Sequence, residues 1–255
     1  MHRQDICAVI PAAGQGSRLG LDVPKILAPI GHDRTVWTCL RDGMLNHVGH
    51  IHVVISPAFL GMVRRQLAAD PHRDRISIGV QEKQRGMGDA IFGAADTWKN
   101  FSHLLVVWGD QAGLSSDTLR RAIALHAAGY GPRCTLPVVE TEQPYVQYVF
   151  RDGLLNTIRQ AREGALVDQH GLSDVGVFLL ETDGLQDAWR DYELIAAAGE
   201  VTGELNFLPF LVYLSQTCRW RFGTVPVTDA SEARGINTRA DLQFFQERWV
   251  ELIVK

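Results

Sequence analysis

The chain has 255 residues, of which 46% are hydrophobic, and its formal net charge is −4. This balance excludes the basic footprint of a nucleic-acid-binding protein, and no run approaches the ~18 apolar residues of a membrane span. The length fits one large α/β domain. The first residues lack the apolar core and cleavage site of a signal peptide, and the four cysteines stand far apart. We therefore expect a cytoplasmic protein with reduced thiols.

Strand and helix patterns alternate along the first half of the chain. Short apolar runs are separated by segments with apolar residues at helical spacing, such as Val36, Leu40 and Met44. This alternation predicts a Rossmann-like α/β fold with a mostly parallel central sheet covered by helices. The predicted strands are 7–11, 51–55, 75–80 and 103–108, and the predicted helices are 35–45, 57–69, 88–98 and one capped by Ser115 that ends at 126.

The pattern changes from residue 133 onward, where shorter strands and turns predict a smaller antiparallel subregion. No linker is visible, so we predict a single domain over 1–255, with one half at 1–130, a second half at 131–235 and a closing helix within 236–255. The remaining predicted elements are strands 134–139, 146–151, 154–158, 175–180 and 220–225, and helices 185–198, 205–214 (interrupted early by Pro209) and 239–252.

A glycine-rich loop follows the first strand and reads IPAAGQGSRLGLDVPK over residues 10–25. Gly14 and Gly16 allow backbone N–H groups to turn toward a ligand with no Cβ in the way. Arg18 and Lys25 add two spaced cations. Amides that cradle oxygens and cations that neutralise moving charge suit a polyphosphate.

Other interpretations of this loop fit less well. A dinucleotide fingerprint requires G-x-G-x-x-G, but the third glycine, Gly20, falls one place late, and the acidic residue expected about 20 positions on is matched only loosely by Asp33. A Walker A sequence is absent from the chain. The remaining alternative is a tight strand-to-helix turn that binds no ligand.

The loop resembles the motif A-A-G-x-G-x-R-x-x-x-x-x-P-K of the nucleotidyltransferases that activate phospho-sugars and related phosphorylated metabolites. It is most similar to the uridylyltransferase half of the bifunctional N-acetylglucosamine-1-phosphate enzymes, and polyol-phosphate cytidylyltransferases have a similar opening. The chain carries no hexapeptide repeat, so we do not expect their β-helix acetyltransferase half. The resemblance implies that Arg18 and Lys25 are catalytic. It implies nucleotide-binding roles for Ala12, Ala13, Gly14 and Gly16.

A second segment, QEKQRGMGDA, begins at Gln81 after a predicted strand. The resembling family has Q-x-x-x-x-G-T-x-x-A here, and its glutamine and first glycine recognise the base, which implies the same role for Gln81 and Gly86. An amide offers a donor and an acceptor to a pyrimidine edge. Met87 replaces the threonine, so one hydroxyl contact is lost and the choice of base stays open. The alternative is an ordinary glycine-containing connection.

Gly109 and Asp110 follow a buried apolar strand, at the end of the sheet where α/β ligand clefts form. A carboxylate there can hold Mg²⁺ against phosphate oxygens. In the resembling enzymes a G-D pair has this role and the asparagine of a later G-[VI]-N shares the metal. The resemblance thus implies Gly109 as a nucleotide contact and Asp110 and Asn237 as Mg²⁺ ligands. The alternative is that Asp110 and Asn237 only cap helices.

The resemblance makes 1–130 the nucleotide-binding half and 131–235 the acceptor-side half, and the acceptor-side half departs from the family. Gln160 and Arg162 stand where the N-acetylglucosamine enzymes have glutamate and lysine, and Asp174 replaces an asparagine. Glu204 and Asn206 lie at a predicted helix start and either face the acceptor or only cap that helix. These departures indicate that N-acetylglucosamine 1-phosphate is not the acceptor. The predicted acceptor-binding residues are Tyr148, Gln160, Arg162, Asp174, Glu204 and Asn206.

The sequence therefore predicts an Mg²⁺-dependent nucleotidyltransferase that moves NMP from an NTP, with UTP or CTP favoured, to a phosphorylated small molecule and releases pyrophosphate. The expected partners are these two substrates, with no nucleic acid or membrane, and the sequence does not reveal the oligomeric state. Two alternatives remain, a cytidylyltransferase for a non-sugar phospho- or phosphonate metabolite and a non-catalytic nucleotide-sensing module on the same fold. An oxidoreductase is disfavoured because no Tyr-x-x-x-Lys dyad is present.

Overall fold

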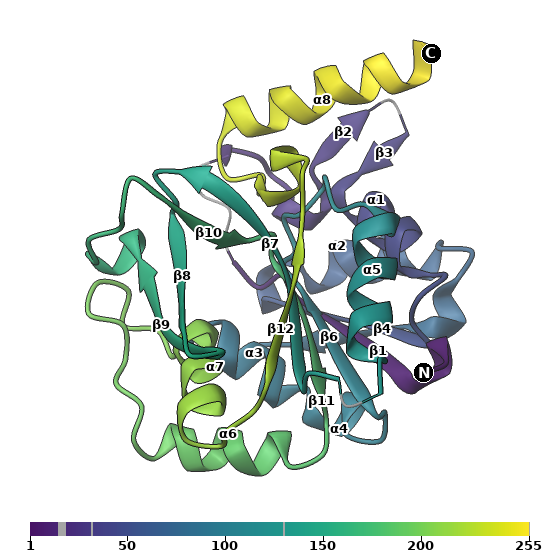
Figure 1. Cartoon of the computed structure of the whole chain (residues 1–255). Helices are drawn as coiled ribbons and strands as arrows, with labels where there is room; N and C mark the ends of the chain where they lie inside the picture. The colour runs from purple at the N-terminus through teal and green to yellow at the C-terminus, as the bar shows by residue number, and fades with distance from the viewer. Residues whose placement is uncertain (15–18, 32, 130, 255) are drawn as a thin grey trace.

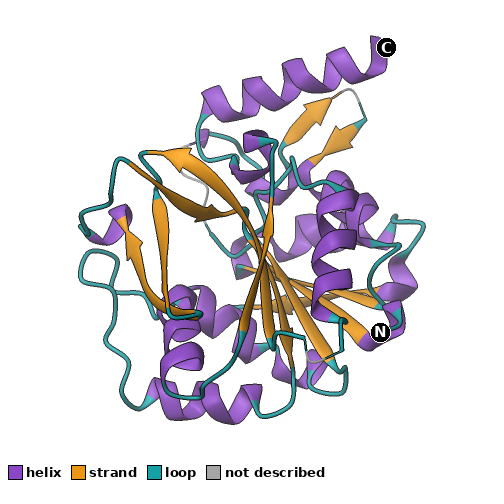
Figure 2. Cartoon of the chain, viewed as in Figure 1, coloured by secondary structure: helices purple, strands orange, loops and turns teal. Residues whose placement is uncertain are grey.

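The computed structural model describes residues 1–14, 19–31, 33–129 and 131–254. Within these ranges the chain forms one ten-stranded mixed sheet and a separate two-stranded hairpin, with helices packed on the large sheet (Figure 1, Figure 2). Gly16, predicted to bind the nucleotide, and Arg18, predicted to be catalytic, lie outside the described residues. None of the described helices is long and apolar enough to cross a membrane.

The elements alternate as the sequence predicts, with short 3₁₀ helices (η) between them. In chain order they are η1 (Arg3–Asp5), β1 (Ile6–Pro11), η3 (Lys25–Leu27), β2 (Pro29–Gly31), β3 (Arg34–Thr35), α1 (Val36–Met44), β4 (His50–Ile55), η4 (Pro57–Phe59), α2 (Leu60–Ala68), η5 (Arg73–Arg75), β5 (Ile76–Val80), α3 (Met87–Gly93), α4 (Ala95–Trp98), β6 (His103–Val107), α5 (Ser116–His126), β7 (Cys134–Glu142), β8 (Val146–Arg151), β9 (Leu154–Gln160), η6 (Ala161–Glu163), β10 (His170–Asp174), β11 (Val177–Glu181), α6 (Leu185–Glu193), α7 (Phe207–Gln216), β12 (Phe222–Pro226), η7 (Ala230–Ala233) and α8 (Arg239–Val254).

The large sheet has a parallel half and a mixed half. Its strand order is β5-β4-β1-β6-β11-β7-β10-β8-β9, and β12 pairs with β7. The strands β5, β4, β1 and β6 are parallel to one another, so their carboxyl ends meet at one edge. From β6 to β9 each pair along this order is antiparallel, while β12 runs parallel to β7. The predicted antiparallel subregion is therefore continuous with the parallel half, in the same sheet.

Two hydrophobic cores cover the two faces of the sheet. Ala8 and Ile10 of β1 belong to one core, together with apolar residues of α1, α2 and α5. Cys7 and Val9 belong to the other, which contains apolar residues of α3, α4, α6 and α7. Side chains alternate along a strand, so an entirely apolar β1 requires cover on both faces. Burial of each large side chain stabilises the fold by about 1.5–3 kcal/mol and fixes the strand ends that carry the site.

Capping residues set several of the helix boundaries. The Ser115 hydroxyl accepts a hydrogen bond from Thr118 N at 3.1 Å, as predicted for the start of α5. The predicted helix over 88–98 instead divides into α3 and α4 at Ala94. Pro209 does not interrupt α7, because it lies in the first helical turn, where no intrahelical acceptor is available for an N–H group.

The sequence did not predict the β2–β3 hairpin or β10. The sequence of β10, HGLSD, has little apolar alternation, and its ladder with β7 holds it in place, from His170–Glu142 to Asp174–Val138. This strand matters for the site because it carries Ser173 and Asp174 toward the carboxyl ends of the parallel strands.

Candidate active site

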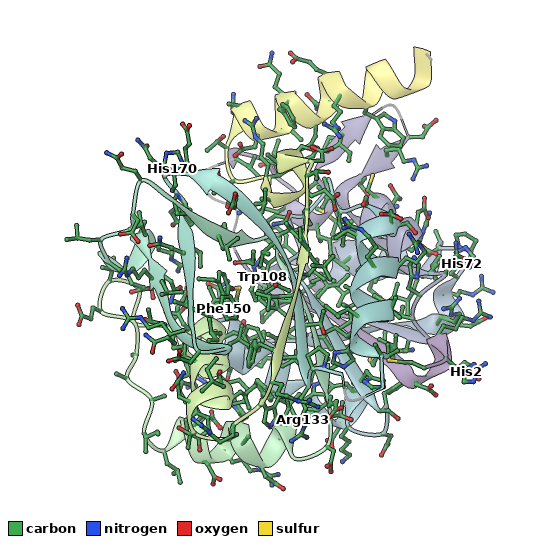
Figure 3. All side chains as sticks on the ribbon, viewed as in Figure 1. His2, His72, Trp108, Arg133, Phe150 and His170 are labelled. Carbon is green, nitrogen blue, oxygen red and sulfur yellow. The ribbon has the colours of Figure 1, made fainter. Side chains whose placement is uncertain are left out.

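A cavity of about 690 Å³ opens at the carboxyl ends of the parallel strands and extends toward the antiparallel subregion. It gathers predicted residues from segments that are far apart in the sequence. Trp108, labelled near the centre of Figure 3, is among its lining residues. The predicted site residues that line it are Ala12, Ala13, Gly14, Lys25, Gln81, Gly86, Gly109, Asp110, Gln160, Arg162, Asp174, Glu204, Asn206 and Asn237.

Lys25 lies between the two predicted metal ligands. Its Nζ donates a hydrogen bond to Asn237 Oδ1 at 2.7 Å and lies 3.6 Å from Asp110 Oδ2. The Lys25 and Asp110 side chains are 20% and 21% exposed, so this contact is partly screened from water. An ammonium group therefore sits against one carboxylate oxygen and one amide oxygen at the edge of the cavity.

The backbone holds these three side chains in place. Ile236 N donates to Asp110 O at 2.9 Å, which ties the loop before α8 to the end of β6. A Cβ at position 235 would lie 3.1 Å from both the Asn237 amide nitrogen and the Asp110 carboxyl, so a larger residue there would press on both predicted metal ligands. Asp241 accepts hydrogen bonds from Asn237 N at 3.1 Å and from Thr238 N at 2.8 Å, while the Thr238 hydroxyl accepts from Asp241 N at 3.2 Å and so caps α8. Because Thr238 supplies the cap, the Asn237 side chain is left to accept a hydrogen bond from Lys25.

The donor set of this cluster fits a divalent cation such as Mg²⁺. Carboxylate and amide oxygens are hard ligands, and Mg²⁺ commonly takes one or two protein oxygens, with water and substrate phosphates as its other ligands. The Lys25 ammonium already occupies a position between Asp110 and Asn237 that attracts positive charge. These residues can therefore hold a metal ion, provided that Lys25 shifts toward a bound phosphate.

The side of the cavity predicted to face the nucleobase is formed by the loop from β5 to α3. Gln81 is 8% exposed, and its amide nitrogen donates to Gly86 O at 2.9 Å. Gly86 has a φ of +114°, and a Cβ there would lie 2.6 Å from Leu205 O, so only glycine fits. Gln84 Nε2 donates to Ala13 O at 2.6 Å. This contact joins the loop from β5 to α3 to the glycine-rich loop after β1.

The part of the cavity predicted to face the acceptor includes η6 and the segment that leads into α7. Glu163 Oε1 accepts hydrogen bonds from Thr202 Oγ1 at 2.7 Å and from Asn206 Nδ2 at 3.2 Å, and its Oε2 accepts from Val201 N at 3.0 Å. The Thr202 hydroxyl bond, with the other donors, lowers the pKa of the Glu163 carboxyl. Glu163 thus holds η6 against the segment over 201–206, and these hydrogen bonds form the Glu163 clasp.

The clasp brings two predicted acceptor residues into contact at the rim of the cavity. Arg162 Nη2 pairs with Glu204 Oε2 at 2.9 Å. The Arg162 side chain is 41% exposed, so water screens this ion pair and the pair is weak. The guanidinium is therefore available to a phosphate. Gln160 and Asn206 line the same part of the cavity.

Asp174 lines the cavity, but Tyr148 does not. Asp174 Oδ1 accepts a hydrogen bond from Gly176 N at 2.6 Å, and burial raises the pKa of this carboxyl despite that bond. Tyr148 is 3% exposed and belongs to the core under β8. Its hydroxyl faces Asp174 without a well-aligned hydrogen bond to any described residue, so its position does not support a direct acceptor contact. Tyr145, three residues earlier and 58% exposed, lines the cavity instead.

Sequence reasoning missed several residues that line the cavity. Trp108 directly precedes Gly109 and Asp110, so the end of its strand could have indicated it. Gln84 stands inside the QEKQRGMGDA segment and Gln111 directly follows Asp110, whereas Tyr145 and Ser173 reach the cavity only through the folded sheet. The additional lining residues include Gln84, Trp108, Gln111, Tyr145 and Ser173.

The fold and the cavity define a class of protein, the nucleotide-binding α/β transferases that hold phosphates at the carboxyl edge of a parallel sheet. A family model narrows the class, because the MobA-like NTP transferase domain matches residues 8–175. The chain belongs to this family and is a nucleotidyltransferase. The resemblance inferred from the glycine-rich loop is confirmed, as is the Rossmann-like α/β fold.

Curated relatives include the bifunctional protein GlmU of Syntrophotalea carbinolica, 29% identical over 259 residues, and that of Kineococcus radiotolerans, 29% identical over 238 residues. These matches cover 95% and 92% of this chain but 51% and 47% of the relatives, so the chain spans about half their length. HddC from Yersinia pseudotuberculosis has a similar fold, with a TM-score of 0.66 at 18% identity, over 95% of this chain and 99% of that one. The HddC structure with GMP-PN gives a TM-score of 0.65 at 17% identity, with the same coverage.

Proposed function

We propose that the chain transfers a nucleotidyl group from a pyrimidine NTP to a phosphorylated sugar or related small molecule, in the presence of Mg²⁺. The observation that carries the proposal is the contact of Lys25 with Asp110 and Asn237, at the edge of a cavity that the glycine-rich loop also lines. A cation, a carboxylate and an amide oxygen at this place suit a triphosphate that must lose pyrophosphate. Membership of the NTP transferase family supports the same chemistry.

The reaction needs positioning more than proton transfer. A phosphate oxygen of the acceptor is already anionic, so it attacks the α-phosphorus in line and needs no general base. A bond forms between this oxygen and the α-phosphorus, while the bond from the α-phosphorus to the bridging oxygen breaks. The electron pair leaves with pyrophosphate. The rate enhancement must then come from alignment of the two substrates and from charge stabilisation.

The residues around the cavity divide these roles. The backbone near Gly14 faces the triphosphate in this proposal, and Arg18 acts with Lys25 to offset charge on the α-phosphoryl group and the leaving pyrophosphate. Lys25 leaves Asn237 and follows the charge that develops on the α-phosphoryl group and the leaving pyrophosphate. Mg²⁺ held by Asp110 and Asn237 would neutralise phosphate charge and orient the triphosphate.

The antiparallel subregion is the proposed acceptor site. Arg162 offers a guanidinium for a phosphate at the rim, and Asp174 and Glu204 offer carboxylates for hydroxyl or amino groups. The resemblance of the glycine-rich loop to enzymes that activate phospho-sugars makes a phosphorylated sugar the first acceptor to test, and phosphorylated polyols and phosphonates follow. HddC was solved with GMP-PN, so guanine nucleotides belong in the donor panel beside the pyrimidines.

The test is pyrophosphate release from the purified chain with Mg²⁺, with UTP, CTP, GTP, ATP and dTTP screened against a panel of phosphorylated acceptors. Release that requires one NTP together with one acceptor supports the proposal and names both substrates. If only a purine NTP supports release in the presence of an acceptor, the pyrimidine preference is refuted. Nucleotide binding by calorimetry without release from any pair would favour the nucleotide-sensing alternative.

A further inference from the structure

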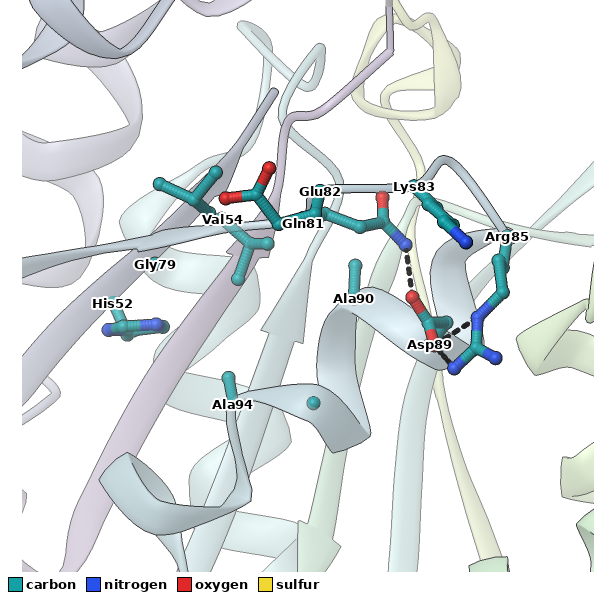
Figure 4. Close-up of a pocket in the computed structure, with 12 residues that line it drawn as sticks. His52, Val54, Gly79, Gln81, Glu82, Lys83, Arg85, Asp89, Ala90 and Ala94 are labelled. Atoms are coloured by element: carbon teal, nitrogen blue, oxygen red, sulfur yellow. Dashed lines mark hydrogen bonds and ion pairs between the residues drawn. The ribbon is translucent and has the colours of Figure 1, made fainter. Parts of the chain in front are cut away.

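Gln81, the proposed base-recognition residue, donates a hydrogen bond to the carboxylate of Asp89, which has no role in the proposed function. Gln81 Nε2 donates to Asp89 Oδ2 at 2.9 Å, in addition to its bond to Gly86 O. Asp89 Oδ1 in turn accepts from Arg85 Nε at 2.9 Å and pairs with the same guanidinium through Nη2 at 2.5 Å. Figure 4 shows this row of three side chains beside a second cavity of about 330 Å³ that Gln81 also lines.

The chemistry of these partners determines which end of the Gln81 amide faces the nucleotide. The Gly86 carbonyl and the Asp89 carboxylate, which is paired with Arg85, can only accept hydrogen bonds. Both hydrogens of the Gln81 amide nitrogen are therefore used inside the protein. The Gln81 carbonyl oxygen points away from Asp89 (Figure 4) and accepts no hydrogen bond from the part of the chain that the structure describes.

We propose that Asp89 is a positioning residue for base selection, which fixes Gln81 as a hydrogen-bond acceptor toward the nucleobase. This inference rests on the proposed function, in which Gln81 reads the base. Bases of equal ring size differ in the order of donors and acceptors on the edge that Gln81 would read. Uracil and guanine carry a ring N–H next to a carbonyl oxygen, whereas cytosine and adenine carry a bare ring nitrogen next to an amino group. An amide of fixed polarity separates these two kinds of base, and an amide that can rotate does not.

Asp89 contributes more to this polarity than Gly86 does. If the Gln81 amide rotated by 180°, its carbonyl oxygen would face both the Gly86 carbonyl and the charged Asp89 carboxylate. Gly86 O also accepts a hydrogen bond from Ala90 N at 3.3 Å, so it keeps a partner in either case. Replacement of Asp89 by asparagine removes the charge and offers an amide that can donate to the rotated carbonyl. The charge on Asp89 is thus the part of the network that opposes rotation most strongly.

The experiment measures dissociation constants of UTP, CTP, GTP and ATP by calorimetry with Mg²⁺ and without acceptor, so that turnover plays no part. We expect the wild-type chain to discriminate between the two members of one pair of equal ring size, UTP with CTP or GTP with ATP, by about 5- to 150-fold. In Asp89→Asn this ratio should fall by about fivefold or more. The matched control is Asp96→Asn, which removes an exposed aspartate paired with Lys99 in the next helix and should leave the ratio unchanged.

A second variant keeps the test decisive if Asp89→Asn is unstable. Asp89→Ser places a hydroxyl that both donates and accepts, so it should relax the ratio in the same way. The inference is overturned if the wild-type chain binds both members of each pair equally, or if folded Asp89 variants keep the full ratio. A chain that binds no NTP would instead refute the proposed function, which keeps the two failures distinct.

Discussion

The replacement of Lys25 by alanine addresses the proposed chemistry most specifically. At 3.6 Å and an effective dielectric constant of about 20, two unit charges interact by about 4–5 kcal/mol. A phosphate oxygen that takes the place of the Asp110 carboxylate would gain a similar interaction, from which desolvation and the lost contact with Asp110 must be subtracted. A net transition-state stabilisation of about 3 kcal/mol remains, which corresponds to a turnover about a hundredfold lower in Lys25→Ala.

Because this stabilisation is made mainly in the transition state, binding of the nucleotide should change little. We expect an NTP dissociation constant within about threefold of the wild-type value in Lys25→Ala, against the hundredfold loss in kcat. The assay combines steady-state pyrophosphate release with calorimetry and a melting curve that confirms folding. Lys99→Ala removes an exposed surface lysine and is the matched control. Turnover close to wild type in folded Lys25→Ala would refute the role given to Lys25.

Three further results are expected. Asp110→Asn should raise the Mg²⁺ concentration needed for half-maximal pyrophosphate release by about tenfold or more, and an unchanged Mg²⁺ titration would remove Asp110 from the metal site. Glu163→Ala should raise the acceptor KM about tenfold while the NTP KM stays constant, because Glu163 clasps the loops that carry Arg162 and Glu204; equal changes in both KM values would contradict this. Burial, with the nearby His103, lowers the pKa of His126 from 6.5 to about 4. Between pH 6.5 and pH 4 the unfolded chain therefore binds a proton at this histidine more readily than the folded chain does. The buried neutral His126 thus contributes about 3 kcal/mol to the free energy of unfolding above pH 6.5, and this contribution is lost as the pH falls to 4. Denaturant unfolding at pH 7 and pH 4.5 should show that His126→Gln flattens this dependence, whereas exposed His170→Gln does not.

The parallel half of the fold followed from the sequence because its elements have strong local patterns. β1 is a continuous apolar run, and Ser115 caps α5 where the sequence places it. Local pattern and tertiary structure agree at these positions. β10 carries no such pattern, since its backbone pairing with β7 outweighs the weak strand preference of HGLSD.

The candidate site was predictable to the extent that it follows strand ends and short motifs. Asp110 and Asn237 lie 127 positions apart in the sequence; Asp110 was indicated by its place after a buried strand, and Asn237 by its resemblance to the asparagine of the family's G-[VI]-N motif. The contacts that orient side chains could not be read in this way. Asp89 behind Gln81 and the Glu163 clasp depend on where separate loops meet in the fold. Tyr148 shows the same limit, because its sequence position does not reveal that its side chain turns into the core under β8.

The central claim is that the chain moves the α-phosphoryl group of an NTP, with its nucleoside, onto a phosphorylated acceptor. The most direct measurement follows two labels in one reaction, with ³²P at the α-position in one sample and at the γ-position in another. The account predicts that the α-label appears in a product containing the acceptor and that the γ-label appears in pyrophosphate. A γ-label found on the acceptor would indicate a kinase, and an α-label found only in free NMP would indicate hydrolysis. Either result would contradict the account.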